Sequence, residues 1–174
     1  MATHRLPILG WATRPDDTGE AFFEPEDVNF GSNDLARNFV LALGSALAAQ
    51  PTVKHGVYGS FLIPKNYVST PKIFVEWAGT LTSGDVVYDF DYNAVGGDGA
   101  ESLDPAAWQE SVTVTDTVGG TARRKMTCSM TLTAGNLAVD DVVQFFLGRD
   151  GADGADTMAG RAYITAAVFE YADV

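Results

Sequence analysis

Apolar and polar residues alternate with a period of two along much of this chain. Between residues 124 and 133, Met, Cys, Met and Leu alternate with Lys, Ser and Thr, so one face is apolar and the other carries hydroxyl groups. Successive side chains of a β-strand point to opposite faces, so this alternation predicts a strand with one buried face. Further strands are predicted at residues 37–43, 57–63, 72–80, 85–93, 110–116, 141–149 and 161–171.

Clusters of Gly, Pro, Asn and Asp separate these segments at intervals of roughly 10 to 20 residues, the rhythm of an all-β protein. About eight strands are expected, which is the number in a two-sheet jelly roll. The sequence therefore predicts an all-β fold, a single jelly-roll-like antiparallel β-sandwich that covers residues 35–174.

Two segments could also be helical. Residues 35–49 are rich in Ala and Leu, but Gly44 and Ser45 interrupt the helical pattern, so a strand followed by a loop is favoured over a helix. Residues 104–108 could form one helical turn, with Asp104 as N-cap and Pro105 at the first helical position.

Residues 1–34 differ from the rest of the chain. Three prolines are spread through them, acidic residues crowd positions 16–27, and large apolar side chains stand isolated. Such a segment cannot form its own core, so we expect an extended N-terminal arm that lies in grooves of its own sandwich or of a neighbouring subunit. The expected interface residues of the arm are Trp11, Phe22, Phe23 and Phe30.

The composition limits the classes of partner that we expect for this chain. The 174 residues include 11 Lys and Arg against 23 Asp and Glu, which gives a formal net charge of -12. This charge repels phosphate backbones and anionic lipid headgroups, so neither a nucleic acid nor a membrane is expected as a partner. No apolar run approaches the roughly 20 residues of a membrane span. The N-terminus lacks the pattern of a secretory signal, so we expect synthesis in a cytoplasm.

The sequence offers few candidates for catalytic residues. His4 and His55 have no Cys or His at metal-ligand spacing, and Cys128 lies on the apolar face of its strand, where a thiol is inert. A nucleophile elbow and a glycine-rich phosphate loop are both absent from the sequence. A hydrolase that uses Asp89 and Asp91 is a weak possibility, because neighbouring carboxylates on one strand face show no division into acid and base. We therefore expect no enzyme.

One acidic loop could bind calcium. Asp150, Asp153 and Asp156 follow one another at intervals of three in a glycine-containing stretch. The alternating donors and distal Glu of an EF-hand are missing, and Asp-Gly pairs are ordinary turn residues, so a plain acidic loop is favoured over a calcium site. No other cofactor is expected.

Aromatic side chains leave an alternative open. They could form a stacking platform for a sugar ring, although most occupy the apolar face of a predicted strand, which favours core packing. The residues concerned are Trp77, Tyr88, Phe90, Tyr92 and Trp108.

Three stretches of the sequence are similar to those of a known group of proteins. They are residues 61–67 (Phe-Leu-Ile-Pro-Lys-Asn-Tyr), residues 75–88, and residues 149–153, which lead through 158–160 into the last strand. Through them, the chain from Gly56 onward resembles small structural proteins of tailed bacteriophages and prophages. The resemblance implies a non-enzymatic jelly-roll component of the virion that forms a trimer, and residues 1–34 lie outside it.

Charge, arm and resemblance together predict a capsid decoration (cement) protein. It would trimerise on the outer capsid surface of the virion and use its arm to contact the major capsid protein and neighbouring decoration subunits. The alternative is a receptor- or carbohydrate-binding head domain of a phage tail fibre, in which exposed aromatic residues and acidic loops recognise a host glycan.

Overall fold

The computed structural model describes residues 2–8, 23–29, 37–43 and 54–173. Within these ranges the chain forms ten strands and a short 3-10 turn, η2 (Ala134–Asn136), and no helix is long and apolar enough to span a membrane. The strands are Thr3–Pro7 (β1), Phe23–Asn29 (β2), Arg37–Leu43 (β3), Lys54–Leu62 (β4), Ser69–Gly79 (β5), Asp85–Val95 (β6), Glu110–Thr117 (β7), Met126–Thr131 (β8), Val142–Asp150 (β9) and Ala162–Ala172 (β10).

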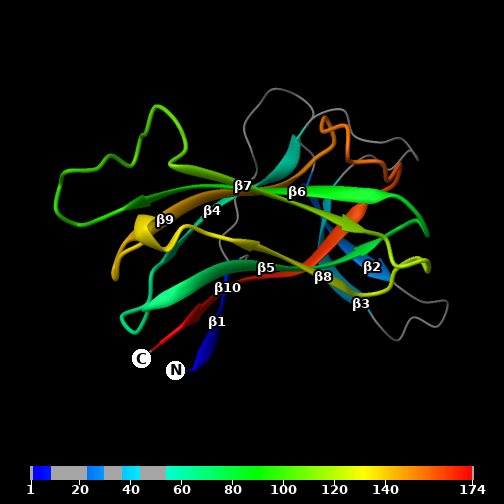
Figure 1. Ribbon diagram of the computed structural model, residues 1–174. Coiled ribbons are helices and arrows are strands. Elements are labelled where there is room, and N and C mark those ends of the chain that lie inside the picture. Colours follow the sequence, from blue (N-terminus) through cyan, green and yellow to red (C-terminus); the bar gives the residue numbers. More distant parts are fainter. Residues whose placement is uncertain (1, 9–22, 30–36, 44–53, 174) are drawn as a thin grey trace.

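The described strands form two antiparallel sheets that are stacked as the layers of a sandwich (Figure 1). Sheet A has the order β2-β3-β10-β5-β8, with β1 also paired to β10, and sheet B has the order β4-β9-β6-β7. The strands β3-β10-β5-β8 and β4-β9-β6-β7 have the strand order of a jelly roll. The predicted all-β jelly-roll sandwich is therefore confirmed, and its eight strands coincide with the eight segments predicted from alternation.

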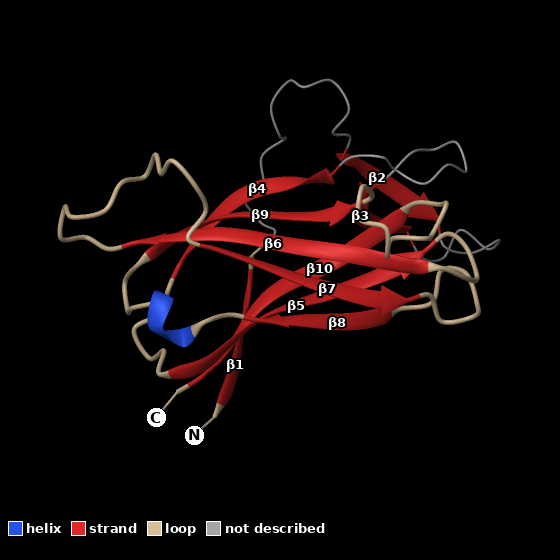
Figure 2. Ribbon diagram, turned by 45° about the horizontal axis from the view of Figure 1, so that its top comes forward, coloured by secondary structure: helices blue, strands red, loops and turns tan. Residues whose placement is uncertain are grey.

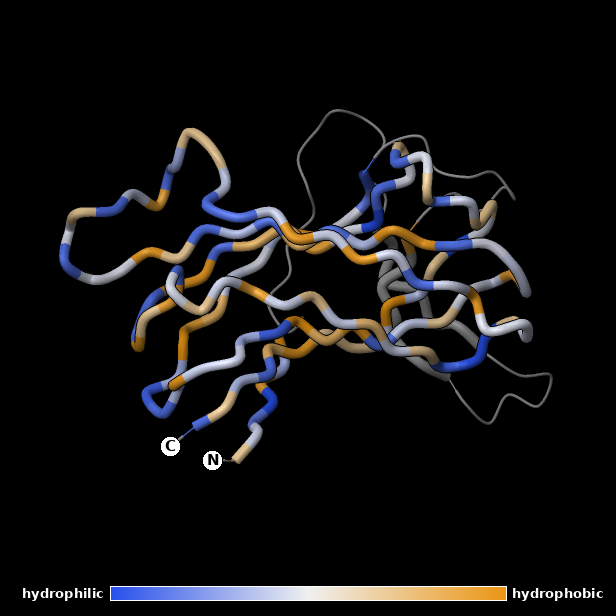
Figure 3. Tube along the Cα trace, in the orientation of Figure 1, coloured by the Kyte–Doolittle hydropathy of each residue, from blue (hydrophilic) through white to orange (hydrophobic). Residues whose placement is uncertain are grey.

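The core lies between the sheets. Apolar and polar positions alternate along the strands that enclose it (Figure 3). Trp77, Tyr88, Phe90 and Tyr92 have no exposed surface, so core packing is confirmed for these four aromatic residues. Cys128 is also buried, and burial raises the pKa of its thiol to about 12, which makes it unreactive at neutral pH.

Two strands come from the segment that was predicted to be an arm. β1 pairs with β10 from Thr3↔Ala172 to Pro7↔Val168, and β2 pairs with β3, so these parts of residues 1–34 extend the chain's own sheet A. Phe23 is the first residue of β2. Of the other expected interface residues, Trp11, Phe22 and Phe30 lie outside the described residues, and contacts with neighbouring subunits stay a prediction.

The first and last described residues of the chain are hydrogen-bonded to each other. The Ala2 amide donates to Asp173 Oδ1 at 2.6 Å, and the Asp173 amide donates to the Ala2 carbonyl at 3.1 Å. His4 Nε2 lies 2.7 Å from Asp173 Oδ2, and its ring stacks on Tyr171 at a centroid distance of 5.3 Å. These contacts give His4 a structural role beside β10.

The loop 151–161 closes one end of the sandwich. Arg149 Nε and Nη2 donate to the two carboxylate oxygens of Asp156 at 2.7 and 2.6 Å, and both side chains are fully buried. Met158 inserts into the core, and its backbone packs so close to Gly84 that a Cβ there would lie 2.8 Å from the Met158 Cα. Gly84 also has a positive φ of 103°, a conformation that glycine adopts without strain.

The two ambiguous segments are resolved differently. Residues 37–43 form strand β3, as favoured, while 44–49 lie outside the described residues. The helical turn predicted at Asp104–Trp108 is wrong, because these residues form bends without helical hydrogen bonding. The Asp104 amide donates to the Ser102 hydroxyl at 3.0 Å, and such local side-chain bonds compete with a helix.

Candidate functional site

The outer face of sheet B carries the residues that alternate with the core positions. Register places Tyr58 of β4 beside Phe146 of β9, Phe146 beside Asp91 of β6, and Asp91 beside Ser111 of β7. One step along the strands, Ser60, Gln144 and Asn93 are aligned in the same way. Because every second residue points away from the core, these side chains form a continuous surface across the four strands.

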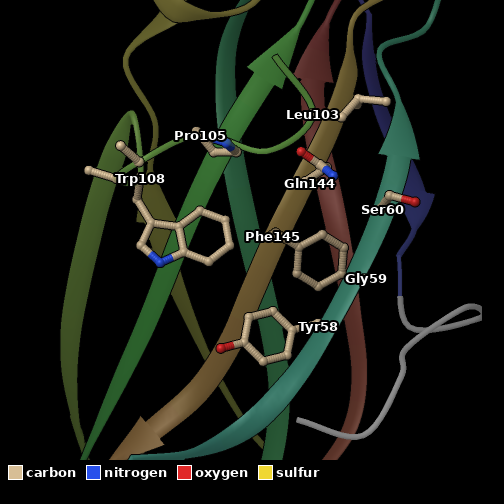
Figure 4. A pocket seen from close by; sticks show the side chains of 10 residues that line it. Tyr58, Gly59, Ser60, Leu103, Pro105, Trp108, Gln144 and Phe145 are labelled. Atoms are coloured by element: carbon tan, nitrogen blue, oxygen red, sulfur yellow. The ribbon is translucent and has the colours of Figure 1, made fainter. Parts of the chain in front are cut away.

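A pocket of about 570 Å³ lies on this face, between strands β4 and β9 and the loop 96–109 that connects β6 to β7 (Figure 4). The loop extends beyond the sandwich at the end opposite to the loop 151–161 (Figure 2). The pocket is lined by Tyr58, Gly59, Ser60, Leu103, Pro105, Ala106, Ala107, Trp108, Gln144 and Phe145.

Two exposed aromatic rings dominate the pocket. The rings of Tyr58 and Trp108 are nearly parallel, with an angle of 18° between their planes and 6.3 Å between their centroids. Tyr58 is 41% exposed and Trp108 is 38% exposed, although aromatic side chains in a sandwich are usually buried. Leu103, at 62% exposed, adds an apolar side chain from the loop. These groups offer flat apolar surface to a ligand.

Two polar side chains stand beside the rings. Gln144 and Ser60 come from neighbouring strands at one register position, and Figure 4 shows both on the same side of the pocket. The amide of Gln144 can donate and accept hydrogen bonds at once, and so can the hydroxyl of Ser60. The pocket therefore combines apolar faces with uncharged groups that can bind hydroxyls.

Phe146 supports Tyr58 from the side. The two rings are 5.2 Å apart, and Phe146 lies over Gly56 and Gly148, which have no side chains. A Cβ at Gly56 would lie 2.6 Å from the Phe146 ring, and a Cβ at Gly148 would lie 2.5 Å from it. The two glycines thus make the space that lets Phe146 lie flat and hold Tyr58 in place.

The loop 96–109 is fastened at its base. The Gln109 amide donates to the Tyr92 carbonyl at 2.9 Å, and the Gln109 side-chain oxygen accepts from the Ala94 amide at 3.0 Å. Asn93 Nδ2 donates to the Ser102 carbonyl at 3.4 Å. Because Trp108 directly precedes Gln109, these bonds fix where its ring enters the pocket.

On the side of Phe146 away from the pocket, the outer face of sheet B carries charged residues. Lys54 Nζ lies 2.5 Å from Asp89 and 3.8 Å from both Asp91 and Asp150. Burial by itself lowers the pKa of Lys54, but the hydrogen bond that Lys54 donates to Asp89 and the negative charges of Asp89, Asp91 and Asp150 raise it more, so the net shift of the pKa is upward. Thr113 donates to Asp89 at 2.8 Å, which leaves this carboxylate held on two sides.

Asp89 and Asp91 are buried on the outer face, and both carboxylates are occupied. Asp91 accepts a hydrogen bond from the Ser111 hydroxyl and faces Lys54, as Asp89 does. Both carboxylates are thus held by the same ammonium and by hydroxyl groups of β7.

The three carboxylates considered for calcium are not brought together. Asp156 is buried in its ion pair with Arg149, Asp150 faces Lys54, and Asp153 stands in the exposed turn, where its Oδ1 accepts from the Ala155 amide at 2.8 Å. Within the described part of the chain, no group of three or more His, Cys, Asp or Glu side chains is arranged to hold a metal ion.

Of the two exposed aromatic residues of the site, the sequence pointed to one. Trp108 belongs to the predicted stacking set, but Tyr58 and Gln144 were missed. The available signal was alternation: on the predicted strand 57–63, Val57 and Phe61 are core positions, which turns Tyr58 and Ser60 outward. A large aromatic residue on the solvent side of a strand marks a candidate binding surface.

No protein-family model matches the sequence, and no curated protein matches it. Among solved structures, the CBM36-1 domain of a multidomain xylanase from the hindgut metagenome of Trinervitermes trinervoides is similar, with 10% identity and a TM-score of 0.47 over 99% of this chain and 100% of that chain. CBM35 from Cellvibrio japonicus Abf62 has 12% identity and a TM-score of 0.40, over 99% of each chain.

A third similar structure is the carbohydrate-binding module CBM36 in complex with calcium and xylotriose, with 13% identity and a TM-score of 0.35 over 97% of this chain and 99% of that chain. At identities of 10–13% and TM-scores of 0.35–0.47, these similarities carry no argument about a ligand or an activity of this chain. The site has to be interpreted from its own geometry.

Proposed function

We propose that this chain is a non-catalytic carbohydrate-binding β-sandwich, and that the pocket between β4, β9 and the loop 96–109 is its binding site. The observation that carries the proposal is the exposed, nearly parallel ring pair of Tyr58 and Trp108 in a surface pocket. This function corresponds to the carbohydrate-binding alternative that the sequence left open.

The chemistry of sugars suits these groups. A pyranose ring has an apolar face of C–H groups and an equatorial rim of hydroxyls. The C–H face would pack on the aromatic rings, and the rim would exchange hydrogen bonds with Gln144 and Ser60. The pocket volume of about 570 Å³ is in the range of small-ligand sites.

The lining residues favour binding without bond cleavage. Among the described residues that line the pocket there is no Asp, Glu, His, Lys or Cys side chain, so the walls hold no group that ionises near neutral pH. The carboxylates of Asp89 and Asp91 lie outside the lining and are engaged by Lys54 and hydroxyl groups.

Glycan-array screening of the full chain, followed by calorimetric titration of the best ligand, would test the proposal. Trp108→Ala and Tyr58→Ala should each weaken binding at least about tenfold, because each removes an aromatic face that the sugar contacts. Leu62→Ala is the matched control: Leu62 is 52% exposed on the same strand as Tyr58 but does not line the pocket.

The control variant should bind like the unmodified chain. All three variants should keep a cooperative unfolding transition, since the replaced side chains lie at the surface. A full array without any bound glycan would overturn the proposed function, and so would binding that survives both aromatic substitutions.

A further inference from the structure

The pocket is uncharged, but its surroundings are acidic. The loop 96–109 contributes Asp98, Glu101 and Asp104, all exposed, and it contains no Lys, Arg or His. Trp108 belongs to the same loop, so these carboxylates are on the segment that forms one wall of the pocket. A ligand that enters along this wall meets negative charge and no cation.

The opposite side has an excess of negative charge as well. Asp91 is two strands away from Tyr58 through Phe146, which corresponds to a backbone separation of about 10 Å. The only cation there among the described residues, Lys54, is shared by Asp89, Asp91 and Asp150. Three carboxylates against one ammonium leave this side with a net negative charge.

The charge of the whole molecule has the same sign, with a formal net charge of -12. Charges within about one Debye length, about 8 Å at physiological salt, act on a bound ligand with little screening, and more distant ones act during approach. A carboxylate or sulfate group on a sugar would be repelled, and it would lose hydration without gaining a cationic partner from the pocket lining.

We propose, on the basis of the proposed function, that the site accepts glycans without acidic groups and rejects uronic, sialylated and sulfated glycans, with amine-bearing sugars bound more tightly than their N-acetylated forms. The aromatic pair supplies the general affinity for sugar rings. The acidic surroundings supply the discrimination by ligand charge, which is a matter of repulsion as much as attraction.

A binding experiment at two salt concentrations separates these effects. The full chain would be tested on an array of neutral, amine-bearing, uronic, sialylated and sulfated glycans at low and at high sodium chloride. At low salt the bound set should contain neutral and amine-bearing glycans only. A methyl-esterified oligogalacturonide should bind at least about tenfold more tightly than the free acid of the same length, and high salt should shrink this difference.

Two Asp residues provide a matched comparison. Asp98 Oδ1 accepts from the Ala100 amide at 2.8 Å, and Asp153 Oδ1 accepts from the Ala155 amide at the same distance. Both residues are exposed, but Asp98 is in the pocket loop and Asp153 is in the loop at the opposite end of the sandwich. Asp98→Asn and Asp153→Asn therefore remove the same charge from the same type of turn.

At low salt, Asp98→Asn should strengthen binding of the free-acid oligogalacturonide, while Asp153→Asn should leave it nearly unchanged. Asp98→Asn combined with Asp104→Asn should strengthen this binding by about threefold or more. Equal or tighter binding of acidic glycans by the unmodified chain would overturn the charge selectivity alone. An array on which no glycan of any class binds would overturn the proposed function, and this inference with it.

Discussion

Arg149 and Asp156 form an ion pair in which neither side chain has any exposed surface. The guanidinium also donates to the carbonyls of Met158 and Gly160, and Asp156 accepts from the Val87 amide at 3.1 Å. Nearly every polar atom of the pair is thereby engaged. The pair ties the loop 151–161 to strands β6 and β9, and it holds Met158 in the core.

Removing one partner of this pair should be costly. Arg149→Met leaves the Asp156 carboxylate buried without its cation, and we expect a loss of about 3–5 kcal/mol in the free energy of unfolding. Chemical denaturation measures this loss. The double variant Arg149→Met/Asp156→Leu should lose clearly less than the sum of the two single variants, and strict additivity would contradict the coupling.

Gly84→Ala should destabilise the chain by about 2–4 kcal/mol. An alanine at this positive φ is strained, and its Cβ would collide with the Met158 backbone. Thermal unfolding would show the loss. Gly154→Ala is the control within the loop that Gly84 contacts, since nothing lies within 4 Å of a Cβ there. Similar losses for both variants would refute the steric explanation.

Lys54→Ala should leave Asp89, Asp91 and Asp150 facing one another without their ammonium, at a cost of about 2 kcal/mol. Millimolar calcium should then raise the melting temperature of the variant by about 3 °C or more, because a divalent ion would replace the lost charge. The unmodified chain should not respond in this way.

Lys125→Ala is the control for this experiment. Lys125 pairs with a single carboxylate, Glu76, at 2.7 Å; the Lys125 side chain is exposed and the Glu76 side chain is half-buried. Loss of this pair should cost less than about 1 kcal/mol and should create no response to calcium. A calcium effect of equal size in both variants would show that the ion acts elsewhere.

Glu110 should make stability depend on pH. Burial raises the pKa of this carboxyl, but hydrogen bonds from the Tyr92 hydroxyl, from the amide and hydroxyl of Thr133 and from Asn136 lower it more, so the net pKa is below its usual value of 4.5. The stabilisation is therefore complete above pH 4.5, where the unfolded chain is also ionised, and is lost as pH falls through the lower folded-state pKa.

Glu110→Gln should be less stable than the unmodified chain at pH 7, by about 1 kcal/mol, and the difference should shrink as the pH falls below 4.5. Denaturation curves at a series of pH values would show this convergence. A difference that stays constant down to strongly acidic pH would assign the effect to packing instead of charge.

Alternation was sufficient to predict the sandwich. The segments of strict period two, such as 85–93 and 124–133, became β6 and β8 with the expected faces inward, because burial of one face fixes the register of a strand. The pairing of β1 with β10 could not be predicted in this way. It depends on an edge of sheet A that exists only once the fold has formed.

The site was harder to predict for a similar reason. Tyr58 and Trp108 are distant in sequence, and they meet because the loop 96–109 extends across the end of sheet B to reach β4. Local patterns report which face of a strand is buried, but they do not report where a long loop goes.

Assembly stays a prediction from the sequence. A trimer, a position on the outer capsid surface and contacts with a major capsid protein concern neighbouring molecules, and the contacts described here are all within one chain. The size of the purified protein in solution, measured by light scattering, would test the trimer directly.

The bonds between Ala2 and Asp173 bring the first and last described residues to one point beside β1 and β10 (Figure 1). Sheet A carries that point, whereas the pocket opens on the outer face of sheet B. A second protein joined to either end would thus be attached at the same place, beside sheet A and away from the sheet that carries the pocket. The chain can be tethered to a larger assembly, by either end, and still present its aromatic pair to the surroundings.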